Sequence, residues 1–256
     1  MTSVAASGPT TSRTASGLKV SDLRATYDNQ VALHGVTIEV PAGSCIAILG
    51  SNGAGKTTLM NSVAGIHRQI EGTIELDGRR IDRLRGHDIA RLGVCYIPEG
   101  RGVFPDLSVA ENLRITIGRD AARRDQLFDR LPALRSLLSR QASSMSGGEQ
   151  QMLAMAPAVV GEYRLLMVDE LSLGLAPIIV DQLFELLHAI RATGVTVILV
   201  EQFAERALEL ADHAYVLRKG RLVFDGPADG LRGNESTLHE LYMGASPTEE
   251  QHAIRP

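Results

Sequence analysis

A glycine-rich segment, GSNGAGKT at residues 50–57, constrains the fold of this chain more than any other feature. It matches the pattern GxxxxGK(S/T) and stands between an apolar run, CIAIL, and a helical pattern, TTLMNSVAGI. The glycines let successive backbone N–H groups point at phosphate oxygens, and a helix starting near Lys56 adds its positive N-terminal end. A plain glycine-rich turn with a surface lysine would not need both flanks. The segment therefore predicts a nucleotide-binding site.

Individual residues of this loop have expected roles. Lys56 can reach the β- and γ-phosphates of a nucleotide such as ATP, and the Thr57 hydroxyl can bind Mg²⁺. We expect the phosphates to be held by Gly50, Ser51, Asn52, Gly53, Ala54, Gly55, Lys56, Thr57 and Thr58.

An acidic pair at the end of an apolar run, LLMVDE at residues 165–170, completes the predicted site. An apolar run followed by two acids is weak evidence alone, because many strands end in solvated carboxylates. Beside the phosphate loop, however, both acids should lie at the carboxyl edge of the same sheet. We expect Asp169 to bind Mg²⁺, and we expect Glu170 to orient and deprotonate the attacking water.

Short apolar runs alternate with helical patterns along most of the chain, which predicts an α/β fold. Runs such as CIAIL and VTVILV are apolar on both faces, as central parallel strands are. We expect a P-loop NTPase core with a mostly parallel sheet, an antiparallel β flank and a helical subdomain inserted at about 100–160. Pro132 should divide the helical stretch at 109–138 into two helices or kink it. The expected strands are 36–40, 45–49, 73–76, 94–97, 165–168, 195–200 and 214–217, and the expected helices are 56–65, 147–160, 178–192 and 204–211.

Composition and the sequences at the two chain ends argue against several classes of protein. The formal net charge of −4 argues against general attraction to nucleic acid, and the longest apolar runs are too short to cross a bilayer. Residues 1–16 lack the apolar core of a signal peptide and predict a disordered leader, and 245–256 predict a loose tail. A single nucleotide-binding domain is expected over 17–244.

The segment MSGGEQQ at residues 145–151 stands just before the strand that ends in Asp169 and Glu170. Together with the phosphate loop, it resembles the ATP-binding subunits of ABC transporters, over roughly residues 18–243. The resemblance implies that Ser146, Gly147, Gly148 and Glu149 clamp the γ-phosphate of ATP held by an opposite subunit. The alternative reading of these four residues is a flexible linker.

Three further residues take on roles through this resemblance. Tyr27 stands where relatives stack an aromatic ring on adenine, although a lone tyrosine can also be simple packing. Glu99 replaces the glutamine that most relatives carry in the loop that contacts Mg²⁺ and nucleotide. Gln202 stands where many relatives have a histidine near the γ-phosphate.

The combination PEGRGVF, MSGGEQQMLAM, SLGLAPII and LVEQ is similar to one branch, the LivF-type ATP-binding proteins of branched-chain amino acid importers. That branch implies an ATPase at the cytoplasmic face of the plasma membrane. Its expected partners are two integral-membrane permeases, a second ATP-binding subunit and, indirectly, an extracytoplasmic solute-binding protein. The second subunit would be a paralogue or a second copy in a head-to-tail dimer. Coupling to the permeases is expected near 102–117, and the cargo is not encoded in this chain.

Two residues depart from the family pattern. Leu171 follows Glu170 where relatives almost always have proline, and Pro157 stands where they usually have arginine. Because proline fixes φ and lacks an N–H, these departures predict slower or altered turnover with nucleotide binding intact. Restoring Leu171→Pro and Pro157→Arg should change the rate of Mg-ATP hydrolysis. Two alternatives stay open: a soluble ABC-type ATPase of an assembly or repair process, and a weakly hydrolysing regulatory subunit.

Overall fold

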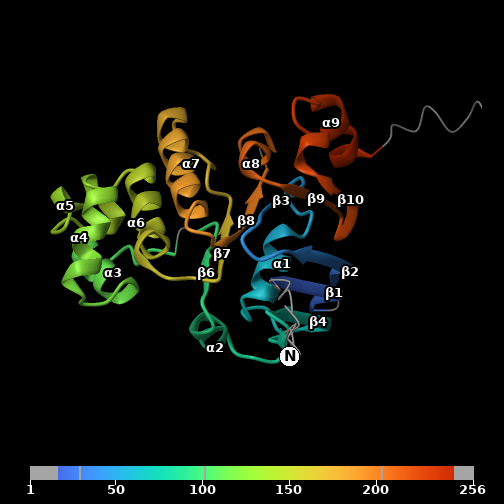
Figure 1. The fold of residues 1–256 in the computed structure, drawn as a ribbon, viewed down its shortest axis with the longest axis horizontal. Helices are drawn as coiled ribbons and strands as arrows, with labels where there is room; N and C mark the ends of the chain where they lie inside the picture. The colour runs from blue at the N-terminus through green and yellow to red at the C-terminus, as the bar shows by residue number, and fades with distance from the viewer. Residues whose placement is uncertain (1–16, 29, 101, 203, 245–256) are drawn as a thin grey trace, which may run out of the picture.

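The computed structural model describes residues 17–28, 30–100, 102–202 and 204–244. The predicted leader at 1–16 and the predicted tail at 245–256 lie outside the described residues. Two sheets and a group of helices build the described part of the chain (Figure 1).

The larger sheet has six strands and carries the nucleotide loop. Its strands run parallel to one another, except that the last two strands along the chain form an antiparallel hairpin. Every residue of β3 and β8 is buried, as the apolar runs predicted. In spatial order the strands are β10 (Arg221–Pro227), β9 (His213–Arg218), β3 (Cys45–Leu49), β8 (Thr196–Glu201), β7 (Leu165–Asp169) and β6 (Val94–Ile97).

The smaller sheet is the antiparallel flank. Its order is β2 (Gln30–Val40), β1 (Leu18–Tyr27), β4 (Ile70–Leu76) and β5 (Arg79–Arg80). Strand β1 is absent from the strands expected from sequence. Its pairing with β2 shifts register between Val20 and Leu23, and Asp22 there has a φ of 47°. Such a bulge interrupts the two-residue alternation by which a half-buried strand is recognised.

The helices divide between the sheets and a separate helical group. Helices α3 to α6 lie together on the left of Figure 1, and the antiparallel strands lie on the right. The stretch at 109–138 forms three helices, because a break after Thr116 adds to the expected one at Pro132. The helices are α1 (Lys56–Val63), α2 (Gly86–Arg91), α3 (Val109–Thr116), α4 (Ala121–Arg130), α5 (Ala133–Ser136), α6 (Gly147–Val160), α7 (Pro177–Arg191), α8 (Ala204–Leu210) and α9 (Glu235–Met243).

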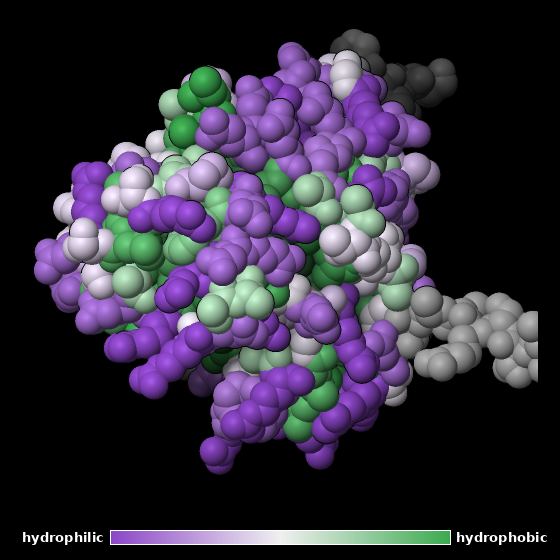
Figure 2. All heavy atoms as spheres, turned by 60° about the vertical axis from the view of Figure 1, so that its left-hand side comes forward, coloured by the Kyte–Doolittle hydropathy of each residue, from purple (hydrophilic) through white to green (hydrophobic). Residues whose placement is uncertain are grey.

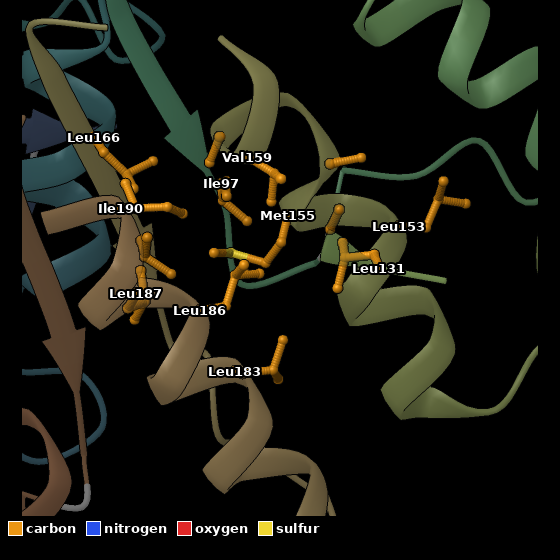
Figure 3. Packing of buried hydrophobic residues seen from close by; sticks show 14 of the residues in the cluster. Ile97, Leu131, Leu153, Met155, Val159, Leu166, Leu183, Leu186, Leu187 and Ile190 are labelled. Carbon is orange, nitrogen blue, oxygen red and sulfur yellow. The ribbon is translucent and has the colours of Figure 1, made fainter. Parts of the chain in front are cut away.

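The apolar cores hold these layers together. One cluster joins the parallel sheet to α6, α7 and the helical group, and Figure 3 shows Met155 and Val159 of α6 facing Leu187 and Ile190 of α7. A second cluster lies between the two sheets around α1. The Tyr215 hydroxyl also joins the sheets, since it hydrogen-bonds the backbone of Glu39. Strand β3 and helix α1, which flank the phosphate loop, both contribute residues to this second cluster.

Helix α6 continues through Pro157 to Val160, so the proline does not end this helix. Proline in a helix interior costs about 3 kcal/mol relative to alanine, and part of this is offset by its stiffening of the unfolded chain. We expect Pro157→Ala to raise the free energy of unfolding by about 2 kcal/mol, measured in urea.

The matched control is Pro177→Ala, at the first turn of α7, where the missing N–H has no helical partner. This control should be nearly neutral. Equal changes at both positions would contradict the assignment of the cost to the interior of α6.

The molecular surface is mixed. The face in Figure 2 is mainly hydrophilic, with apolar residues in several separate places. Within the described part of the chain, no helix combines the length and apolarity needed to cross a membrane.

Candidate functional site

The phosphate loop joins β3 to α1 at the carboxyl edge of the parallel sheet. Gly50 has a φ of 151°, and a Cβ there would lie 2.3 Å from the Leu217 carbonyl oxygen, so a larger residue does not fit. Gly55, with a φ of 106°, caps the start of α1 in a left-handed conformation that favours glycine. The glycines at both ends of the loop are thus required by its backbone path.

A cavity of about 550 Å³ opens over this loop. Most loop residues expected to bind phosphate line it, together with Glu99 and Glu170. Sequence reasoning missed four other lining residues. The complete lining is Val31, Ala32, His34, Asn52, Gly53, Ala54, Gly55, Lys56, Thr57, Thr58, Glu99, Glu170 and Lys219.

Lys219 comes from the turn between β9 and β10. This turn is fixed to the loop, because the Gly220 N–H donates to the Ala54 carbonyl at 2.9 Å. Glycine is required at 220, since a Cβ would lie 2.3 Å from the Ala32 carbonyl oxygen. A lysine before a turn glycine gives no sequence signal for such a position.

Lys56 and Glu170 form a buried ion pair in the wall of the cavity. Lys56 Nζ lies 3.1 Å from Glu170 Oε1, and the two side chains are only 5% and 6% exposed. Nζ also donates to the Gly50 carbonyl at 2.8 Å. The lysine expected to hold phosphate and the carboxylate expected to activate water therefore neutralise each other in this structure.

The backbone of Glu170 is unusual. Its φ of 54° lies in the left-handed region, which costs free energy for a residue with a Cβ. Its N–H donates to the Val200 carbonyl at 2.8 Å, which ties it to β8. The next side chain, Leu171, is buried in the core beside α6 and α7.

Asp169 is fully buried at the end of β7 and accepts a hydrogen bond from the Tyr96 hydroxyl at 3.2 Å. Burial raises the pKa of Asp169 to about 6, and nearby Glu170 and Glu99 add to the shift, while contacts from Thr57 and Tyr96 oppose it. Its Oδ1 is buried without a well-formed hydrogen bond to any described residue. A free carboxylate oxygen beside a threonine hydroxyl is a donor set that fits Mg²⁺.

Ser146, Gly147, Gly148 and Glu149 lie at the start of α6, and none of them lines the cavity. Ser146 and Glu149 form a reciprocal cap. The Ser146 N–H donates to Glu149 Oε2 at 2.7 Å, and the Glu149 N–H donates to Ser146 Oγ at 3.3 Å. The structure thus separates this segment from the phosphate loop of the same chain.

Tyr27 and Gln202 also lie outside the cavity lining, as do Gly50, Ser51 and Asp169. The Tyr27 ring contacts the His67 ring, with 4.1 Å between centroids and an angle of 32° between the ring planes, and Tyr27 is half-exposed. Gln202 follows β8, and its backbone carbonyl accepts a hydrogen bond from the Tyr242 hydroxyl at 3.3 Å.

The ABC transporter family model matches residues 33–172. The high-affinity branched-chain amino acid transport ATP-binding protein BraG of Pseudomonas aeruginosa is 41% identical over 87% of this chain and 98% of BraG. The probable branched-chain amino acid transport ATP-binding protein LivF of Archaeoglobus fulgidus is 37% identical over 89% of this chain and 98% of LivF. A solved ATP-binding subunit of an ABC transporter matches 88% of this chain and 99% of its own, with 29% identity and a TM-score of 0.77, which confirms the predicted fold.

Proposed function

The chain belongs to the ABC transporter family of ATPases, and from that membership we propose that it energises an importer of branched-chain or related amino acids. The observation that carries the proposal is the cavity in which the phosphate loop meets Glu170 and Glu99. The cargo follows from the likeness to BraG and LivF, which extends over almost the full length of both relatives.

Within this cavity the loop residues would bind the ATP phosphates, and Glu170 would act as general base. Its carboxylate would accept a proton from water while the water oxygen bonds to the γ-phosphorus. The bond from that phosphorus to the β–γ bridging oxygen breaks, which yields ADP and phosphate. The phosphates must first compete with Glu170 for Lys56, because the two side chains are paired at 3.1 Å.

Asp169 and Thr57 are the residues that would hold Mg²⁺, and Glu99 would face it from the cavity wall. When bound, Mg²⁺ would neutralise charge on the β- and γ-phosphate oxygens. The Tyr96 hydroxyl would keep the Asp169 carboxylate oriented through its hydrogen bond to Oδ2.

A second ATP-binding subunit would complete the site. The separation of 146–149 from the cavity of the same chain supports a head-to-tail pair in which these residues reach ATP on the opposite subunit. Their backbone N–H groups at the start of α6 suit a phosphate. Tyr27 would turn from His67 to the adenine, and Gln202 would approach the γ-phosphate on closure.

The permease contacts are proposed for the helical group, near 102–117. Phe104 and Ile115 there are large apolar side chains that are exposed in the described structure. Two integral-membrane permeases and an extracytoplasmic solute-binding protein would supply the pathway, with this chain at the cytoplasmic face of the membrane.

The test is affinity capture of tagged Glu170→Gln protein from native membranes with Mg-ATP, followed by mass spectrometry. Slow hydrolysis should hold the closed pair together, and the expected products are two multi-span permeases and a second ATP-binding subunit. Wild-type protein captured without nucleotide is the control. Uptake of leucine, isoleucine and valine by cells lacking this chain should then fall.

Recovery of the tagged chain only with non-membrane partners would contradict the importer proposal. Unchanged amino acid uptake would contradict the proposed cargo alone, because membrane partners would still support a transporter.

A further inference from the structure

Glu201, the last residue of β8, is a buried carboxylate that the proposed hydrolysis does not use. It is 2% exposed, and no ion pair involves it in the described part of the chain. Burial raises the pKa of Glu201 to about 7, and hydrogen bonds from Ser172 partly oppose the shift. Carboxylates are rarely buried without a cation, so the groups that stabilise this buried carboxylate indicate what it does.

The hydrogen bonds to the Glu201 carboxylate come from Ser172 and from the backbone of Leu171, the two residues that follow Glu170. The Ser172 hydroxyl donates to Glu201 Oε2 at 2.7 Å, and the Ser172 backbone N–H donates to Oε1 at 3.2 Å. Both carboxylate oxygens are therefore engaged by a serine two residues after Glu170. Hydrogen bonds to a buried carboxylate are stronger than those between neutral groups.

The position of Ser172 matters because Glu170 has a strained backbone. A residue in the left-handed region keeps that conformation only where its neighbours are fixed. On one side, the Glu170 N–H is fixed to the Val200 carbonyl of β8. On the other side, the chain is fixed to β8 again, through Ser172 and Glu201.

Gln202 follows directly after the end of strand β8, and this strand lies between β7 and β3. Glu201 is paired in register with Leu49, the residue before the phosphate loop, and Val200 is paired with Asp169. The end of β8 is therefore the common attachment point of the segments that carry Lys56, Glu170 and Gln202.

We propose that Glu201 is a positioning residue that clamps Ser172 to the end of β8 and thereby holds Glu170 in the backbone conformation required for water activation. The inference rests on the proposed function, since it assigns Glu170 as the base. Glu201 itself touches neither water nor nucleotide.

The charged and titratable groups that face Glu201 are Glu170, which follows β7, and Tyr242 of α9. The negative charge of Glu170 raises the pKa of Glu201, and the charge of Glu201 in turn raises the pKa of Tyr242. Lys56 already pairs with Glu170. The clamp is therefore held by hydrogen bonds from Ser172 and the Leu171 backbone, and within the described residues Glu201 has no cation as an ion-pair partner.

The experiment compares Glu201→Ala, Ser172→Ala, the double variant and Glu201→Gln in the full chain. It measures kcat for Mg-ATP hydrolysis and the Kd of a non-hydrolysable ATP analogue. Each alanine variant should lower kcat about tenfold or more while Kd stays within about twofold, because the phosphate loop is untouched. The double variant should be no slower than Glu201→Ala, since Glu201→Ala already removes the acceptor of the Ser172 hydroxyl as well as that of the Ser172 backbone N–H.

Glu201→Gln is the conservative variant, and it should keep most of the activity. Its amide oxygen can accept from the Ser172 N–H, and its NH₂ can donate to Ser172 Oγ. A merely structural defect would lower kcat and nucleotide affinity together. Glu205→Ala, an exposed acid in the first turn of α8, should be neutral in both measurements.

Full activity of Ser172→Ala, multiplying effects in the double variant, or a Glu201→Gln variant as slow as Glu201→Ala would each overturn the clamp. A wild-type chain without ATPase activity would instead contradict the proposed function. Wild-type activity that is lost in Glu170→Gln and kept in both alanine variants would overturn the clamp alone.

Discussion

Substitution of Glu170 by glutamine should lower the rate of ATP hydrolysis by a factor of about 10² to 10⁴, the range expected for loss of a general base. The amide has the shape of the carboxylate but cannot accept a proton from water at neutral pH. The measurement is single-turnover hydrolysis of Mg-ATP by the full chain, so that product release does not hide the chemical step.

The same substitution should not weaken ATP binding. The Glu170 carboxylate lies 3.1 Å from Lys56 Nζ, where it would compete with phosphate for the lysine. Glutamine removes this competitor and also removes a negative charge beside the γ-phosphate. We expect the Kd for ATP to fall by up to about tenfold, or about 1.4 kcal/mol.

Glu185→Gln, an exposed residue on α7, is the matched control and should change neither quantity. Hydrolysis by Glu170→Gln within about threefold of wild type would exclude Glu170 as the base. Weaker ATP binding would instead show that the ion pair with Lys56 is needed to shape the loop.

The parts of the site that follow from local pattern could be predicted from the sequence. The phosphate loop needs glycines at set spacings, and a buried strand ending in Asp169 and Glu170 has a recognisable composition. Parallel strands place such ends at one edge, so these groups could be expected to meet. The cavity does contain the loop together with Glu170 and Glu99.

Other features depend on contacts between distant segments and leave no local pattern. The hairpin turn that brings Lys219 to the cavity is fixed by Gly220, whose hydrogen bonds reach Ala54 and His34. The Tyr96 hydroxyl reaches Asp169 across 73 positions. Sequence periodicity reports which face of an element is buried, and it does not report which polar groups meet there.

The pairing of Lys56 with Glu170 is another contact between distant segments, and it predicts a large effect on stability. Lys56→Met should lower the free energy of unfolding of the nucleotide-free protein by about 3–5 kcal/mol, because a buried carboxylate loses its only ion-pair partner among the described residues. Methionine keeps the length and apolar stem of the side chain, so the loss is chiefly electrostatic. The effect is measured by chemical denaturation of Lys56→Met, Glu170→Gln and the double variant, compared with wild type in a double-mutant cycle.

Combining Lys56→Met with Glu170→Gln should restore most of that stability, since the second change removes the uncompensated charge. The chain offers a matched control in Lys19 and Glu39, which lie 2.9 Å apart but are 54% and 66% exposed. Water screens that pair, so Lys19→Met should have little effect.

If Lys56→Met were as mild as Lys19→Met, the buried pair would not contribute to the folded state. Glu170 would then be free to leave Lys56 before nucleotide arrives. A large loss with recovery in the double variant would instead mean that ATP must displace a stabilising internal contact. Part of its binding energy would be spent in freeing the catalytic carboxylate, so the base becomes available only when the phosphates occupy the loop.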